Sequence, residues 1–81
     1  MVVSVSFNGL QRKEARTDKI QVPVSEKTRV IDVLRYVQKC YPDIPLNEEA
    51  VVVMVNNKVS RLNQRLKGND KVSFIPYIGG G

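Results

Sequence analysis

The sequence predicts a small α+β domain in which one helix covers one face of a β-sheet. Stretches that alternate apolar and polar residues, as half-buried strands do, lie on both sides of a single segment with helical periodicity. The 81 residues suffice for one domain with a single core layer. Because one helix can cover only one sheet face, we expect a two-layer α+β sandwich.

Two strands are expected before the helix. Residues 3–7 alternate apolar residues with serines, and an Asn-Gly pair ends this first strand. Residues 10–18 are polar and lack periodicity, which indicates a mobile connection. Residues 19–24 resume the alternation. Because Pro23 removes a ladder donor there, we place this second strand at a sheet edge.

The helix is expected to begin at Thr28 as its N-cap and to end before Pro42. Asp32 in the first turn and Lys39 in the last turn suit the helix dipole. Cys40 lies on the apolar stripe, so we expect its thiol to be buried and inert. The stripe has the spacing i, i+3, i+4, i+7 and i+11 and consists of Val30, Val33, Leu34, Val37 and Tyr41.

Three strands are expected after the helix. Residues 51–55 are apolar at every position, which predicts a strand covered on much of both faces. Residues 58–66 suit either a turn of helix or a short strand, and we assign a short edge strand. Residues 71–77 alternate again after a strong turn signal. If the first and last strands are neighbours they run parallel, because the crossover between them includes the helix.

Composition excludes several classes of site. The single Cys40 excludes an internal disulfide, and the absence of histidine excludes the usual zinc and iron–sulfur ligand sets. We therefore expect no bound metal or cofactor. No apolar run approaches the roughly 20 residues that span a membrane. The first residues lack the pattern of a signal peptide, so a cytoplasmic location is expected.

Basic residues gather in segment 58–71 of a chain whose formal net charge is +5. Such a segment favours an acidic partner surface or phosphates, although the bases could equally lie on a solvated face. No aromatic residue apart from Phe74 accompanies them, so nucleic acid is not an expected partner. The bases are Lys58, Arg61, Arg65, Lys67 and Lys71, and Asp70 is the only acid among them.

The sequence ends in three glycines, Gly79, Gly80 and Gly81. With no following segment to turn into, residues 79–81 are expected to form a flexible tail after a domain of residues 1–78. A carboxylate on Gly81 could then enter a narrow slot in another protein. A frayed end or a cloning remnant is the alternative. If residues follow Gly81 in the cell, they must be removed before any chemistry.

Three stretches resemble the MoaD/ThiS family of ubiquitin-like sulfur carriers. They are residues 55–58 (VNNK), residues 66–72 (LKGNDKV) and residues 74–81 (FIPYIGGG). The resemblance covers the whole chain and implies a β-grasp fold with sheet order 2-1-5-3-4. Asn69 stands where the family usually has glycine, and asparagine tolerates the left-handed backbone angles of such a turn. The family ends in Gly-Gly, which Gly80 and Gly81 match, so Gly79 is an added spacer.

The resemblance implies a carrier protein rather than an enzyme. An E1-like adenylating enzyme would activate the Gly81 carboxylate with ATP, and a persulfide from a sulfur donor would displace AMP to leave a thiocarboxylate. Activation is needed because an ionised carboxylate is a poor electrophile. The implied acceptor is the large subunit of molybdopterin synthase, a synthase of the thiazole type, or a tRNA-thiolating enzyme.

A partner-binding surface is expected beside the tail. If Phe74 faces the helix, Ile75 and Tyr77 point away from it and form an apolar patch. Arg61 and Arg65 are expected to flank this patch and to pair with acidic residues of the partner. In the alternative, Tyr77 covers the sheet edge and both arginines are solvated.

Two other functions compete with sulfur transfer. A lysine amine that attacked the adenylated Gly81 would form an isopeptide bond, which would make the chain a ubiquitin-like protein modifier. A basic module that binds nucleic acid or protein without tail chemistry is the third possibility. The sequence leaves all three open.

Overall fold

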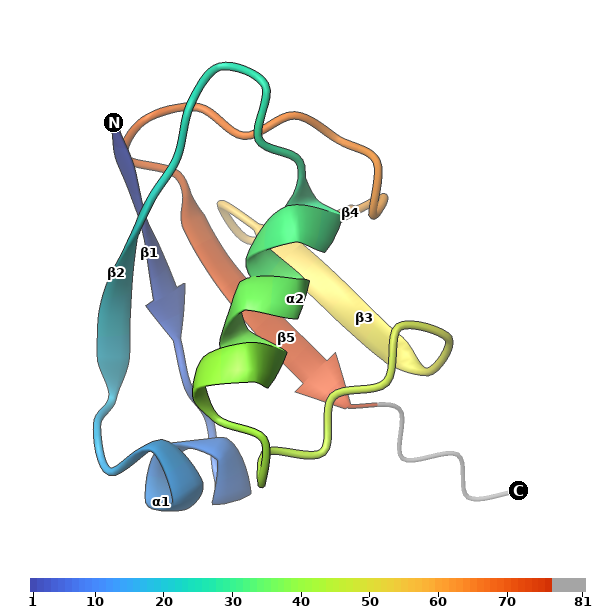
Figure 1. Cartoon of the computed structure of the whole chain (residues 1–81). Coiled ribbons are helices and arrows are strands. Elements are labelled where there is room, and N and C mark those ends of the chain that lie inside the picture. The colour runs from blue at the N-terminus through green and yellow to red at the C-terminus, as the bar shows by residue number, and fades with distance from the viewer. Residues whose placement is uncertain (77–81) are drawn as a thin grey trace.

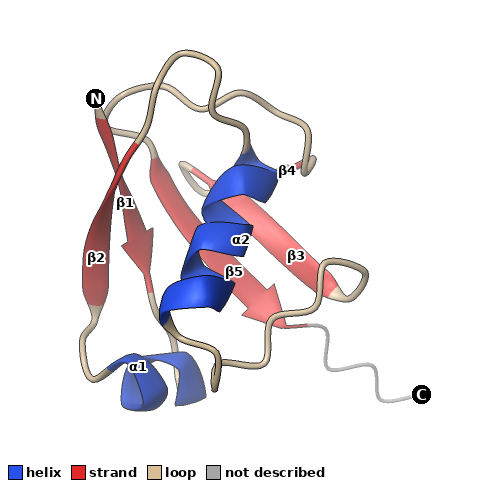
Figure 2. Ribbon diagram, viewed as in Figure 1, coloured by secondary structure: helices blue, strands red, loops and turns tan. Residues whose placement is uncertain are grey.

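In the computed structural model, which describes residues 1–76, a five-stranded mixed sheet packs one face against a helix (Figure 1). A second, short helix lies at one end of the sheet (Figure 2). The elements are β1 (Val2–Ser6), α1 (Leu10–Ala15), β2 (Lys19–Pro23), α2 (Val30–Cys40), β3 (Val51–Val55), β4 (Lys58–Ser60) and β5 (Lys71–Pro76). Among residues 1–76, no helix has the length and apolar character needed to cross a membrane.

The strand order is β2-β1-β5-β3-β4, which confirms the expected topology. β1 and β5 are parallel, and the other neighbouring strands are antiparallel. β5 is therefore the central strand, and Val72 lies opposite both Val5 of β1 and Val55 of β3. β2, which contains Pro23, is one edge, and the three-residue β4 is the other, as predicted.

The expected mobile connection over residues 10–18 is wrong, because α1 occupies most of it. Gln11 explains why this charged segment folds. Its side chain is only 3% exposed, and its amide Nε2 donates a hydrogen bond of 2.8 Å to the backbone oxygen of Phe74. Arg16 ends the helix in a left-handed conformation with φ of 59°. This long-range hydrogen bond, together with the packing of Ala15 against the core, stabilises a helix that has no apolar stripe.

α2 begins one residue later than expected, because its N-cap is Arg29 and not Thr28. The backbone N–H of Arg29 donates to Oδ2 of Asp32 at 2.9 Å, which closes the first turn. The Thr28 hydroxyl instead accepts a 2.9 Å hydrogen bond from the backbone N–H of Ser25 in the preceding turn. The threonine therefore stabilises the approach to the helix rather than the helix itself.

Cys40 is exposed, which contradicts the buried thiol expected from the apolar stripe. It is the last residue of α2, and the next residue, Tyr41, covers the core there. The Tyr41 ring meets the Phe7 ring edge-on, with 5.5 Å between centroids. One turn earlier, hydrogen bonding with Cys40 raises the pKa of the Tyr36 phenol.

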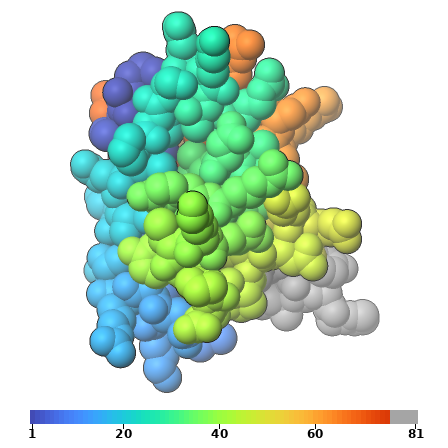
Figure 3. Space-filling view, viewed as in Figure 1, coloured from blue at the N-terminus to red at the C-terminus, as the bar shows by residue number. Residues whose placement is uncertain are grey.

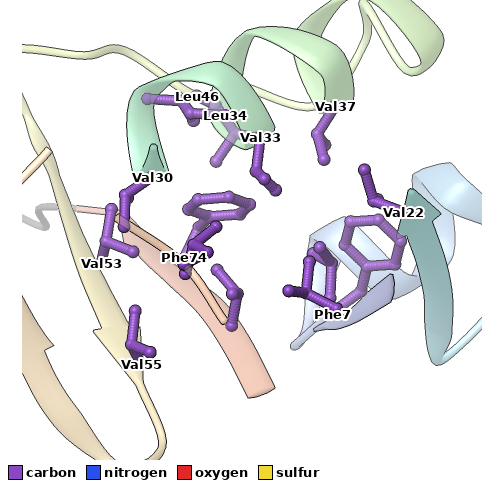
Figure 4. Close-up of a cluster of buried hydrophobic side chains, with 14 of the residues drawn as sticks. Phe7, Val22, Val30, Val33, Leu34, Val37, Leu46, Val53, Val55 and Phe74 are labelled. Carbon is purple, nitrogen blue, oxygen red and sulfur yellow. The ribbon is translucent and has the colours of Figure 1, made fainter. Parts of the chain in front are cut away.

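The core lies between α2 and the sheet, with Phe74 of β5 at its centre (Figure 4). The Phe74 ring is fully buried beneath Val30 and Leu34 of α2. The buried apolar residues are Val3, Val5, Phe7, Val22, Val30, Val33, Leu34, Val37, Ile44, Leu46, Val53, Val55, Leu66, Val72 and Phe74. Together they form one cluster, as a single core layer requires.

The prediction that β3 is covered on much of both faces is wrong for the face away from α2. Val53 and Val55 are buried against α2, whereas Val52 is 37% exposed on the opposite face. Met54 is half-buried on that same open face. Within residues 1–76, both helices leave this side of β3 uncovered, so its apolar side chains are available for contact.

The packing of the core predicts that alanine substitutions at two residues of α2 have very different effects on stability. Leu34→Ala should lower the free energy of unfolding by about 2–5 kcal/mol, because Leu34 is fully buried and the substitution leaves a cavity. Tyr36→Ala should change it by less than about 0.5 kcal/mol, because Tyr36 is 42% exposed and lies outside the core cluster. Urea denaturation of both variants measures the difference, and equal losses would contradict the packing described here.

Candidate functional site

The strand that leads to the C-terminal glycines is held on both sides. β5 ends at Pro76, which lies opposite Val51 of β3. On the other side β1 ends earlier, with Ser6 opposite Ser73. Tyr77, Gly79, Gly80 and Gly81 lie outside the described residues, and their predicted roles stay predictions.

Gln11 takes the place of a strand partner where β1 stops. Its Nε2 donates to the backbone oxygen of Phe74, and its Oε1 accepts a 3.3 Å hydrogen bond from the backbone N–H of Asn8. Within residues 1–76, no buried side-chain nitrogen or oxygen lacks a hydrogen-bond partner. Gln11 therefore fixes the end of β5 close to residues 77–81, a role that the sequence analysis missed.

Ile75 points away from α2, as the strand alternation predicts, and is 45% exposed. Val52 of β3 lies directly opposite it, and Met54 follows on the same face. We call these three residues the open-face patch. Ile75 is two residues before position 77 in the sequence. That Ile75 contacts a partner stays a prediction.

The structure separates the two arginines expected to flank Ile75. Arg61 directly follows Ser60, the last residue of β4, which lies opposite Val53 of β3. Arg65 instead forms an isolated β-bridge with Arg29 at the start of α2, on the other face of the sheet. Arg65 therefore does not flank Ile75, and the flanking role of Arg61 stays a prediction.

The positive charge of segment 58–71 is not neutralised by ion pairs within the described residues. The ion pairs there join Arg12 to Asp18 and Arg35 to Glu48. The second pair, 2.8 Å long, raises the pKa of the Arg35 guanidinium through its hydrogen bond with Glu48. Residues 1–76 contain no cluster of three potential metal ligands.

The turn before β5 has the backbone that the sequence predicts. Asn69 adopts a φ of 70°, the left-handed conformation in which asparagine replaces glycine at limited cost. Its backbone N–H donates a 2.7 Å hydrogen bond to the backbone oxygen of Val2, which ties the turn to β1. The turn therefore sets where β5 begins.

A family model described as the ThiS family matches residues 5–81, a span that includes the glycine tail. The chain belongs to the ThiS family. It thus belongs to a family of ubiquitin-like sulfur carriers. Proteins of this family are small carriers that act with partner enzymes and are not catalysts themselves.

Solved structures of related proteins share the fold over nearly the whole chain. SAMP1 from Haloferax volcanii has a TM-score of 0.80 at 17% identity, covering 100% of both chains. A protein from Pyrococcus furiosus described as molybdopterin converting factor subunit 1 has a TM-score of 0.82 at 22% identity, covering 96% of this chain and 99% of that one.

CysO in the BexX/CysO complex of Amycolatopsis orientalis has a TM-score of 0.67 at 22% identity, covering 98% of this chain and 99% of that one. At these identities the likeness establishes the β-grasp fold alone. No curated protein matches the chain.

The contacts of Gln11 predict a loss of stability when its amide is removed. Gln11→Leu keeps a buried side chain but leaves the backbone groups of Asn8 and Phe74 unpaired, which should cost about 1–3 kcal/mol of unfolding free energy. Gln21→Leu, at an exposed position on β2, is the matched control and should cost less than about 0.5 kcal/mol. Thermal or urea unfolding measures both. Equal stability of the two variants would show that the buried amide does not anchor β5.

Proposed function

We propose that this chain carries sulfur as a thiocarboxylate on Gly81. The observation that carries the proposal is that the ThiS family match runs to residue 81 and so takes in the glycine tail. The central strand of the sheet leads straight into that tail in the sequence. In this proposal the carboxylate of Gly81 is the reacting group, and the folded domain provides the surface that partner enzymes bind.

The carboxylate requires activation by a partner. A C-terminal carboxyl has a pKa of about 3.3–3.7, so it is ionised and a poor electrophile at neutral pH. An E1-like adenylating enzyme joins it to the α-phosphate of ATP, and pyrophosphate leaves. A persulfide sulfur then attacks the carbonyl carbon and AMP leaves. A thiol finally cleaves the resulting S–S bond, and the sulfur stays on Gly81.

The chain contributes recognition to these steps and binds neither ATP nor the sulfur donor itself. The sequence has no histidine, so general acid and base groups of that kind come from the partner. The glycines have no side chains and fit a narrow catalytic slot, but fixing them costs conformational entropy. Contacts made by the folded body, Ile75 first among them, offset that cost.

The consumer of the sulfur is an acceptor enzyme in the cytosol. The large subunit of molybdopterin synthase, a thiazole synthase and a tRNA-thiolating enzyme all suit a thiocarboxylate donor. Molybdopterin converting factor subunit 1 among the structural neighbours favours a role in cofactor biosynthesis. The BexX/CysO complex is a solved case of a related carrier with another protein.

Protein modification is the second candidate. SAMP1 of Haloferax volcanii, whose fold this chain shares, is named small archaeal modifier protein 1. Sulfur transfer and protein modification share the adenylation step and differ in the next one. A lysine amine in place of the persulfide would attack the same carbonyl carbon and form an isopeptide bond. The nucleophile that the partner presents therefore decides the outcome.

Intact-mass analysis tests the proposal. Incubation with the E1-like enzyme of the source organism, ATP and a sulfur donor should replace one oxygen of the chain by sulfur. A variant lacking Gly80 and Gly81 should show no change. Covalent adducts with other proteins would identify a modifier instead. An unchanged mass, together with salt-dependent retention on nucleic acid, would indicate a binding module without tail chemistry.

The open-face patch predicts a second result in the same assay. Ile75→Asp should slow loading by about tenfold or more, because it puts a charge in the centre of an apolar contact. The fold should persist, since Ile75 is exposed. Leu10→Asp places the same charge at another exposed apolar position, on α1, and should load normally. Normal loading of Ile75→Asp with retained circular dichroism would exclude the patch as a docking surface.

A further inference from the structure

A second surface lies at the β4 edge of the sheet and borders the open-face patch at Val59, which lies opposite Met54. A hollow of about 480 Å³ opens between the β3–β4 hairpin and residues 64–70, the segment that returns to β5. Its lining carries three cations, Lys58, Arg65 and Lys67. We call this hollow the basic groove. In Figure 3 the orange atoms of the returning segment stand beside the green atoms of α2.

The charge of the basic groove is not balanced within the described residues. None of its three cations forms one of the ion pairs found in residues 1–76. Asp70 is the acid in its lining, and both carboxylate oxygens are occupied. Oδ1 accepts a 2.9 Å hydrogen bond from Nδ2 of Asn56, and Oδ2 accepts a 2.7 Å hydrogen bond from the backbone N–H of Lys67. The groove therefore attracts anions.

The groove suits carboxylates better than phosphates or nucleic acid bases. Phosphate sites often use free amides at a helix N-terminus, but the first amides of α2 are already bonded. The N–H of Val30 donates to the backbone oxygen of Gln64 at 2.9 Å, and that of Ile31 donates to the backbone oxygen of Leu62 at 2.8 Å. The lining contains no aromatic ring, so bases have no stacking surface.

The edge of the sheet beside the groove can pair with an extended chain. Asn56 and Asn57 form a two-residue hairpin turn with φ of 53° and 68°, so Lys58 and Ser60 direct their backbone groups towards β3. Val59 between them then directs its N–H and C=O outwards. Outside the β3–β4 ladder, no backbone hydrogen bond in residues 1–76 involves Val59. Its side chain, 73% exposed, adds an apolar contact.

We propose that the basic groove binds an extended acidic segment of a partner protein. The segment pairs with β4 at Val59, and its alternate side chains place carboxylates against Lys58, Arg65 and Lys67. The groove lies at the Val55–Val72 end of the sheet, about 14 Å along β5 from the Val51–Pro76 end. A partner can therefore occupy it while residues 77–81 are bound elsewhere. This inference does not depend on thiocarboxylate chemistry.

A peptide titration tests the proposal on the full chain. The probe is a short peptide that alternates glutamate with valine, added to the ¹⁵N-labelled protein and followed by NMR. The amide signals of Val59 and of the three cationic residues should shift, and the affinity should fall as salt rises. The combined substitution Lys58→Gln, Arg65→Gln and Lys67→Gln should weaken binding by about tenfold. Its matched control, Lys13→Gln, Lys27→Gln and Lys39→Gln, removes the same charge elsewhere and should bind normally.

Three results would overturn the inference. Equal binding by a matched peptide with glutamine in place of glutamate would show that charge does not contribute to recognition. Equal binding by a peptide methylated on the backbone nitrogens that face Val59 would exclude strand pairing. Tighter binding of inorganic phosphate or a single-stranded oligonucleotide at the same residues would assign the groove to phosphate ligands.

Discussion

The pairing of β5 with two strands at once is the constraint on which the rest of the structure depends. Val72 lies opposite Val5 on one side and Val55 on the other, so β5 cannot shift its register without breaking both ladders. With that register fixed, strand alternation sends Phe74 into the core and Ile75 out of it. The burial that stabilises the domain thus also determines which side chain is presented next to residues 77–81.

Most of the fold could be predicted, because its elements have local signals. Strand alternation, the helical stripe and Pro23 at an edge follow from short-range periodicity, and the resemblance supplied the strand order. α1 could not be predicted, because its buried contact joins Gln11 to a backbone group 63 residues away. The exposure of Cys40 depends on Tyr41 covering the core, which periodicity does not encode.

The candidate site likewise has features with a local sequence signal and features that depend on long-range contacts. The orientation of Ile75 follows from alternation and was predicted, whereas the position of Arg65 was not. Arg65 belongs to a segment whose carbonyl oxygens, those of Leu62 and Gln64, bond to the first amides of α2. That segment is held by the helix rather than by the sheet, so it carries its charge to the opposite face. The basic residues of segment 58–71 are neighbours in the sequence, but in the folded domain they do not all lie on one surface.

This division matters for a carrier that must meet more than one protein. Ordering glycines costs more conformational entropy than ordering any other residue, so a tail alone binds weakly and folded surfaces must supply affinity. A partner that holds one folded surface raises the effective concentration of the tail at its own catalytic slot. Ile75 of the open-face patch lies next to Pro76, whereas Lys58 of the basic groove lies opposite Val55 at the other end of β3, so one surface can be engaged while the other is exchanged. The pairing of β5 with β3, and of β3 with β4, fixes the distance between these two surfaces.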